Sequence, residues 1–235
     1  MSCGNHACPF HELEAIVGAH NGADLACRVT DSVKQVRFDA GSVLFAQGEP
    51  STSLYSLSNG IVKITCHTTG GREQIVGIAN PGNLLLGLQS LETDRYQYSA
   101  VAETDVVACK IRHRGLLKEA SENGDVALRL LKALNAQLAH SRELMRVMGH
   151  RCAAAKIASF ITLLIPEAER ARQHFTLPFS RAEIASLLGL SEETVCRQMA
   201  RMKRRGILYA PRGRIEILDW DGLLAVADES CPDMT

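Results

Sequence analysis

The stretch that decides the fold is "SRAEIASLLGLSEETVCRQMARMKRRGIL", residues 180–208, which continues as "YAPRGRIEIL". Ser180 followed three residues later by Glu183 has the spacing of a capping box, in which each residue satisfies the other's backbone N–H. This pattern predicts a helix that starts after Ser180 and runs through Leu188.

A second helix and a wing follow directly. Gly189 permits a sharp turn, and Ser191 begins a helix that we expect to reach about Arg205. Polar residues come early in this helix, and apolar residues lie behind them: Val195, Met199 and Met202. After it, "ILYAPRGRIEIL" alternates around the turn Pro211-Arg212-Gly213, as a two-stranded wing does. The segment is predicted to be a winged helix-turn-helix.

Charge is concentrated in this segment. The chain has 26 Lys and Arg and 26 Asp and Glu, so nucleic-acid binding must come from local clustering. Residues 197–214 contain no acidic residue and carry these cations: Arg197, Arg201, Lys203, Arg204, Arg205, Arg212 and Arg214. The cluster predicts a face that contacts DNA phosphates, against the alternative of a solvated helix face.

The rest of the chain shows two different patterns of apolar residues. Residues 36–111 alternate short apolar stretches with turn signals such as Ser58-Asn59-Gly60, which indicates a compact antiparallel barrel or roll. After Gly124 a long helical period carries an apolar stripe, of which the clearest members are Leu131, Leu134, Leu138, Met145 and Met148. We expect the stripe to pair with a twin in a homodimer; the alternative is a helix packed within its own chain.

These patterns predict an α+β fold over 235 residues, with 46% apolar residues to fill its cores. The expected parts are a cysteine-bearing segment (1–35), a β-roll sensor domain (36–120), a dimerisation helix (121–150) and a winged helix-turn-helix domain (151–235). No apolar run of membrane-spanning length and no signal-peptide pattern occurs, so we expect a cytoplasmic protein with no membrane partner. In a reducing compartment its eight cysteines favour metal binding, thiol redox chemistry or plain burial over disulfides.

The order roll, long helix, winged helix-turn-helix resembles the Crp/Fnr family of bacterial transcription regulators over essentially the whole chain. Within "LGLSEETVCRQMARM", Glu193 and Arg197 match the Glu-x-x-Ser-Arg of the Fnr branch, whereas Cys196 stands where that branch has Ser. The resemblance implies a cyclic-nucleotide-binding-like β-roll, also called a double-stranded β-helix. It also implies a dimer that binds palindromes with TTGAT-like half-sites, and RNA polymerase as a further partner.

The chemistry of these side chains suits base reading. A carboxylate can accept from a cytosine amino group, and an Arg fork can hold guanine O6 and N7. Glu193 and Arg197 lie four residues apart and therefore share one helix face. The predicted DNA-binding residues are Arg181, Ser191, Glu193, Thr194, Cys196, Arg197, Arg201 and Arg212. The Cys196 thiol either makes binding oxidation-sensitive or is a small stand-in for Ser.

The effector is a separate question. In cyclic-nucleotide-binding relatives, a Gly-Glu pair after the "PG" turn and a later Arg-Ser hold the ribose and the cyclic phosphate. Here residues 84–88 supply no Glu, and Tyr98 precedes Ser99 where Arg would be needed. A buried phosphate would lack its counter-charge, so cyclic AMP is not expected, although Arg95 lies nearby.

Cysteine chemistry is the alternative that the resemblance offers. Fnr proteins hold a [4Fe–4S] cluster with four thiolates. The candidates here are Cys3, Cys8, Cys27 and Cys109, with wider spacing than in Fnr proteins. Competing uses are a thiol–disulfide switch, free thiols, and a haem held by Cys or by one of the early histidines, His6, His11 and His20. The cysteines expected to be inert core or tail residues are Cys66, Cys152 and Cys231.

The leading hypothesis is a homodimeric DNA-binding regulator, not an enzyme, that senses oxygen, nitric oxide or redox state. A haem-based or effector-independent regulator of the same type is the alternative. A cupin-like metal enzyme is the hypothesis from another class, disfavoured because the roll offers His67 and His113 without a dense set of His and Glu ligands.

Overall fold

The computed structural model describes residues 33–67, 70–71, 73–81, 85–88, 93–165, 174–175, 179–210 and 215–228. By their internal contacts the residues form two compact units, 1–140 and 141–235, whereas the sequence placed the boundary near residues 149–151. No helix in these described ranges has the length and hydropathy needed to span a membrane.

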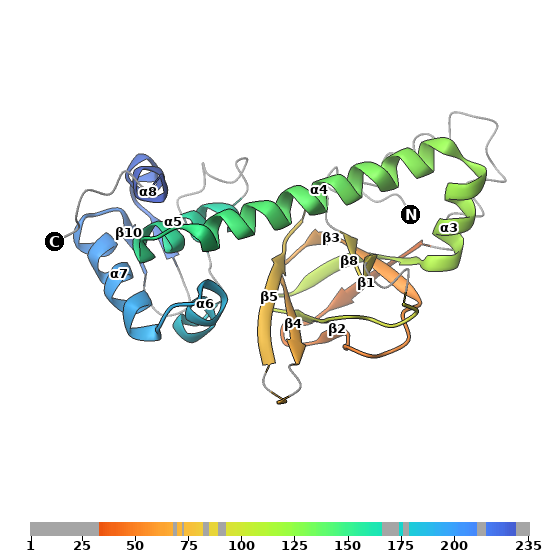
Figure 1. Cartoon of the computed structure of the whole chain (residues 1–235), viewed down its shortest axis with the longest axis horizontal. Helices are drawn as coiled ribbons and strands as arrows, with labels where there is room; N and C mark the ends of the chain where they lie inside the picture. The colour runs from red at the N-terminus through yellow and green to blue at the C-terminus, as the bar shows by residue number, and fades with distance from the viewer. Residues whose placement is uncertain are drawn as a thin grey trace. The chain divides into compact units, whose positions relative to one another are not determined.

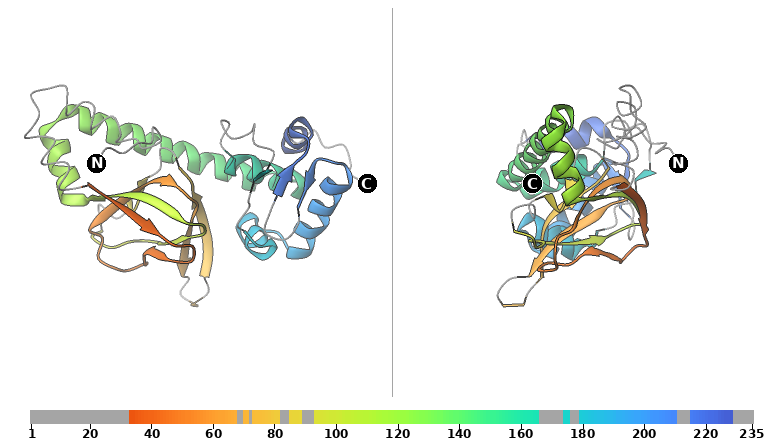
Figure 2. Two further views of the ribbon diagram at one scale, coloured as in Figure 1. Left: turned by 180° about the vertical axis from the view of Figure 1, so that it is seen from behind. Right: turned by 90° about the vertical axis from the view of Figure 1, so that its right-hand side faces the viewer.

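The first unit is built from two antiparallel four-stranded sheets, ordered β1-β8-β3-β6 and β2-β7-β4-β5 (Figure 1). The strands are β1 (Val33–Phe38), β2 (Val43–Phe45), β3 (Ser53–Asn59), β4 (Val62–His67), β5 (Glu73–Ala79), β6 (Leu85–Leu86), β7 (Ser99–Ala102) and β8 (Val106–Arg112). They wrap around a common interior, which confirms the expected roll (Figure 2).

The turn between β3 and β4 shows why the sequence needs glycine there. Gly60 has φ +91°, a left-handed conformation that L side chains rarely adopt. A Cβ at this position would lie 2.4 Å from the carbonyl oxygen of Asp105, so a side chain would also collide with the neighbouring backbone. The predicted turn Ser58-Asn59-Gly60 is therefore fixed both by conformation and by space.

Aromatic rings fill the interior of the roll. The Phe45 and Tyr96 rings stack with their centroids 4.0 Å apart, and the Tyr55 ring stacks on Phe45 with a centroid distance of 5.7 Å. The Tyr96 hydroxyl donates to the Ser53 carbonyl over 2.7 Å, so its polar end is satisfied inside the core. Burial raises the pKa of both tyrosines, which are held in the neutral form that can donate.

Two helices follow the roll. The helix α3 (His113–Glu122) covers the end of the segment assigned to the roll from the sequence and extends two residues beyond it, and α4 (Gly124–Gly149) is the expected long helix. They pack on the sheet that contains β3 and β8 through an apolar cluster, with members Leu54, Leu88, Cys109, Ile111, Leu116, Val126 and Ala133.

The predicted stripe of α4 is exposed in the chain by itself. Relative exposures are 61% for Leu131, 43% for Leu134, 48% for Leu138, 61% for Met145 and 49% for Met148. Each of these side chains therefore leaves a large part of its surface uncovered by its own chain, and the pairing with a second copy that the sequence predicts stays a prediction.

The second unit carries the helices α5 (Ala153–Leu164), α6 (Arg181–Leu188), α7 (Glu192–Arg204) and α8 (Trp220–Ala227). Its sheet is ordered β10-β11-β9, from β10 (Leu208–Tyr209), β11 (Ile215–Ile217) and β9 (His174–Phe175). The first two strands are the expected wing, and β9 was not predicted. The core includes Ile157, Phe160, Ile184, Leu188, Met202 and Leu223.

Candidate nucleic-acid interface

The interface is built from α6, the turn after it, α7 and the wing. Ser180 and Glu183 form the predicted capping box: the Glu183 N–H donates to Ser180 Oγ over 3.1 Å, and the Ser180 N–H donates to Glu183 Oε2 over 2.9 Å. Two of the N–H groups that a helix leaves without a helical partner are thereby satisfied. The helix begins at Arg181 and ends at Leu188, as the sequence predicted.

The turn and the start of α7 also follow the sequence. Gly189 ends α6 in the left-handed conformation, with φ 64° and ψ 39°. Ser191 is the N-cap of α7, and its Oγ accepts from the Thr194 N–H over 3.2 Å. The glycine reverses the chain, and the serine fixes where the second helix begins.

One face of α7 is buried and the other is exposed. Val195 and Met202 are fully buried and Met199 is 3% exposed, so this face is part of the core of the second unit. Glu193, Cys196 and Arg197 are all exposed. Packing on α5 and α6 therefore determines which side chains of α7 are available to a partner.

Glu193 and Arg197 orient one another on that exposed face. Arg197 Nη1 lies 3.3 Å from Glu193 Oε1, while their side chains remain 51% and 86% exposed. Arg197 Nη2 donates to Thr194 Oγ1 over 3.4 Å, and that hydroxyl lies 2.8 Å from Ser191 Oγ. A pair this exposed adds little to stability, so its consequence is orientation of the guanidinium.

The remaining predicted contacts differ from one another. Arg201, one turn after Arg197, is half-buried. Arg212, which the sequence predicts to be in the wing turn, lies outside the described residues. Arg181 is half-buried and turned inward: its Nη2 donates to the Ala210 carbonyl over 3.4 Å, and its Nη1 lies against the Met199 sulfur.

The wing strands pair as expected, with Leu208 opposite Ile217 and Tyr209 opposite Glu216. On their outer side, the Lys203 ammonium lies 4.9 Å from the centroid of the Tyr209 ring, which is 42% exposed. This contact links the last turn of α7 to the wing and leaves the cation at the surface.

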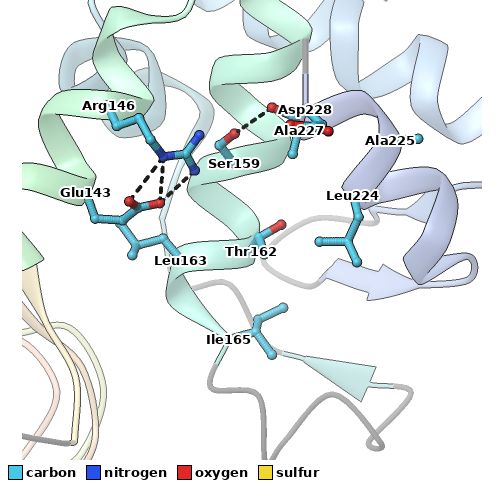
Figure 3. Close-up of a pocket in the computed structure, with 10 residues that line it drawn as sticks. All are labelled: Glu143, Arg146, Ser159, Thr162, Leu163, Ile165, Leu224, Ala225, Ala227 and Asp228. Carbon is cyan, nitrogen blue, oxygen red and sulfur yellow. Dashed lines mark hydrogen bonds and ion pairs between the residues drawn. The ribbon is translucent and has the colours of Figure 1, made fainter. Parts of the chain in front are cut away.

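A hollow of about 760 Å³ lies between the end of α4, α5 and α8 (Figure 3). Arg146 Nη2 and Nε bond Glu143 Oε1 over 2.6 and 3.0 Å, and this pairing raises the pKa of the guanidinium. Ser159 Oγ donates to the Ala227 carbonyl over 3.3 Å and lies 3.1 Å from His150 Nε2. The polar groups that line this hollow therefore bond one another, and the bond from Ser159 to Ala227 fastens α8 to α5.

The roll shows how the residues expected around a cyclic nucleotide are used. Ser99 Oγ accepts from the Gln47 N–H over 3.0 Å and is buried, while Tyr98 is half-buried. Arg95 is exposed, and its Nη1 donates to the Gly48 carbonyl over 2.6 Å. The polar groups near the expected phosphate position are thus engaged with the chain's own backbone.

The predicted metal ligands fall mostly beyond the described part of the chain. Cys3, Cys8 and Cys27 lie there, as do Cys231 and the early histidines. Cys109 is 3% exposed, within the apolar cluster under α3 and α4. Cys66 and Cys152 are half-buried. Within the described ranges, no three His, Cys, Asp or Glu side chains gather as a metal site would need.

Gln198 is a buried polar residue that was not predicted from the sequence. It lies on α7 and is 9% exposed, and among the described residues no donor reaches its Oε1. A polar residue within the buried period of an amphipathic helix, between Val195 and Met202, is the signal that would have found it.

Comparison with known proteins supports the same arrangement. Residues 35–123 match the cyclic nucleotide-binding domain, and residues 155–226 match the Crp-like helix-turn-helix domain. The chain is 31% identical over 191 residues to the transcriptional activator protein anr of Pseudomonas aeruginosa, covering 80% of this chain and 78% of that one. It is 30% identical over 201 residues to FnrA of Stutzerimonas stutzeri, covering 84% and 82%.

The fold is also found in solved structures. FixK2 from Bradyrhizobium japonicum superimposes with a TM-score of 0.71 at 24% identity, covering 85% of this chain and 99% of that one. Both matched domains and the curated relatives are those of transcription regulators, not of enzymes, so the cupin-like enzyme is excluded. The chain belongs to the Crp/Fnr family of DNA-binding transcription regulators.

Proposed function

We propose that the protein acts as a homodimer in the cytoplasm, reads palindromes with TTGAT-like half-sites through α7, and regulates transcription in response to oxygen, nitric oxide or redox state. The observation that carries the DNA-reading part is the exposed pair Glu193 and Arg197, which the core of the second unit turns outward. RNA polymerase is the partner through which such a regulator would act.

Base reading follows from the chemistry of this pair. Arg197 presents a planar fork of donors that matches guanine O6 and N7, and Glu193 presents an acceptor for a cytosine amino group. The Thr194 hydroxyl and the Glu193 carboxylate hold the fork in place before DNA arrives. The exposed cations Lys203 and Arg204 at the end of the same helix, and Arg205 directly after it, are suited to phosphate contacts.

A homodimer would account for the exposed stripe on α4. Six large apolar side chains in one helix, the five of the stripe and Leu128, are each more than two-fifths exposed, which is unusual on a monomer surface. Two copies paired along this stripe would bury it, and a two-fold dimer would present two copies of α7 to a palindrome.

The proposed sensing of oxygen, nitric oxide or redox state rests on Cys109 and on the position of Val33, where the chain enters the roll. Val33, the first residue of β1, pairs with Ile111 of β8, two residues from Cys109. Cys27 is therefore within about 20 Å of chain length from that point. Cys109 also shares its apolar cluster with Val126 and Ala133 of α4, so a change at its sulfur would be felt at the dimerisation helix.

Of the four proposed ligands of a [4Fe–4S] cluster, Cys109 is the one that lies among the described residues. Cys109 is enclosed by apolar side chains, and the other three proposed ligands belong to residues 1–32. A bound cluster would supply an oxygen-labile link between that segment and β8. The chain's own contribution is the placement of Cys109, which serves a thiol switch as well as a cluster.

Cyclic AMP is not part of the proposal. The roll interior is occupied by the stacked rings of Phe45, Tyr55 and Tyr96, and Ser99 is engaged by the Gln47 backbone. Tyr98, and not an arginine, directly precedes Ser99, so the charge that would balance a buried phosphate is missing from that position.

The test is to purify the full chain without oxygen, record its visible absorbance, and measure its affinity for an inverted TTGAT duplex before and after air. A broad visible absorption that air bleaches, together with a fall in affinity, supports the cluster. Loss of affinity without colour, restored by a thiol reductant, supports the thiol switch. A sharp Soret band indicates haem, and identical affinity throughout overturns the sensing part.

A further inference from the structure

Arg181 differs from the exposed cations of the DNA-binding face, such as Arg204 and Arg205. It is the first residue of α6, yet its guanidinium points to residues 18 and 29 positions further along the chain, Met199 and Ala210. Burial lowers its pKa, whereas Arg204 and Arg205 are exposed. A cation that serves only to touch a phosphate has no reason to be folded inward in this way.

The two contacts join three elements. Met199 belongs to the buried face of α7 and is 3% exposed. Ala210 follows β10 directly and is the last described residue before the wing turn, residues 211–214. The guanidinium therefore bridges the start of α6, the middle of α7 and the base of the wing, and its rigid planar fork is the side chain best suited to hold two such contacts.

The base of the wing, residues 208–210, needs such an additional contact to hold it in place. Among the described residues, two residue pairs join β10 to β11, Leu208 with Ile217 and Tyr209 with Glu216, and the Ile207 carbonyl before β10 accepts from the Leu218 N–H over 2.9 Å. A two-residue ladder by itself is a weak restraint. Arg212 and Arg214, which follow Ala210 in the sequence, can act on DNA together with α7 only if the wing base is held at a fixed place relative to that helix.

We propose that Arg181 is a positioning residue, which fixes the base of the wing against α7 through Ala210 and Met199, and that it is not a direct phosphate contact. The proposal corrects our own expectation of Arg181 as a DNA-contacting residue. It rests on the DNA-binding function given above. Its consequence is that α7 and the wing bind DNA as one preformed surface.

The test compares Arg181→Gln, Arg181→Lys and the exposed control Arg204→Gln, each in the full chain. Amide hydrogen exchange is measured first, in the free protein. Both Arg181 variants should exchange about tenfold faster at Tyr209 and Glu216. The amide of Ile184, in α6, should stay as protected as in the wild type, which shows that the unit is folded. Arg204→Gln should change none of these amides.

Affinity for the inverted-repeat duplex is then measured as a function of salt. Loss of one phosphate contact per subunit lowers the slope of log K against log salt by roughly 2 for a dimer. Arg181→Lys keeps the charge, so for a positioning residue it should keep the wild-type slope and still bind about tenfold more weakly. If Lys restores wild-type affinity and only Gln lowers the slope, Arg181 is a phosphate contact and the proposal is overturned.

Two outcomes separate this proposal from the function beneath it. Wild-type protein that ignores the palindrome would remove the proposed base reading, while the exchange data would still decide whether Arg181 holds the wing. Should both Arg181 variants unfold, Met199→Leu takes their place, because it removes the sulfur and keeps the core filled. Unchanged exchange at Tyr209 in that variant would contradict the bridge.

Discussion

The interior of the roll and the outer face of α7 use their side chains in opposite ways. In the roll, Tyr96 turns inward, where its ring stacks on Phe45 and its hydroxyl is bonded to the backbone. On α7, Glu193 and Arg197 are held by neighbours yet remain open to a partner. The difference shows that packing determines which polar groups can act. The polar groups inside the roll bond to the chain itself, whereas those on the outer face of α7 are exposed to a partner.

Truncation inside the roll should have the largest effect on stability. Tyr96→Ala removes a ring that lies 4.0 Å from Phe45, and it should lower the free energy of unfolding by about 3–5 kcal/mol. Tyr96→Phe keeps the ring and loses the hydroxyl that donates to Ser53, so about 1 kcal/mol is expected. Urea denaturation followed by circular dichroism measures both. Equal losses would show that the stack does not support the roll.

The exposed stripe of α4 provides the next test, because it is apolar like the core but exposed like α7. Leu131→Glu combined with Leu138→Glu should give a monomer by sedimentation and weaken palindrome binding by about 100-fold, through loss of bivalence. Leu117→Glu is the control, since Leu117 is 46% exposed on α3 and not on the stripe. A double variant that still sediments as a dimer would contradict the assigned interface.

Gln198 breaks the pattern of α7, since it is a polar side chain on the buried side. Gln198→Leu should raise the free energy of unfolding of the second unit by about 1 kcal/mol, because a buried oxygen without a donor is removed. Gln198→Glu should lower it, because it buries a charge. The fluorescence of Trp220, the only tryptophan of the chain, follows this unit. A destabilised Leu variant would mean that Gln198 has a partner.

Local signals made the helix-turn-helix predictable. Ser180 and Glu183 bond one another across three residues, and Gly189 takes the left-handed conformation that its position demands. Interactions of this kind lie within one turn of the chain, so spacing alone identifies them. The apolar period Val195, Met199, Met202 then fixed the buried face of α7, and with it the exposure of Arg197.

Long-range contacts explain what the sequence did not predict. The strand β9 has two residues and exists through its pairing with β11, some forty residues away. The helix α3 starts after Arg112 without a side-chain cap, so no start signal marks it. Arg181 reads as a surface cation at a helix start, and only the fold reveals that its guanidinium meets Met199 and Ala210.

Base reading by Arg197 on α7 is the central part of the proposed function. The most direct measurement is the affinity of wild type and Arg197→Ala for two duplexes that differ only in the half-site, TTGAT and TTAAT. We expect the wild type to prefer TTGAT by roughly 1–3 kcal/mol and the variant to bind both equally. A variant that keeps the full preference for TTGAT would show that another residue reads this base.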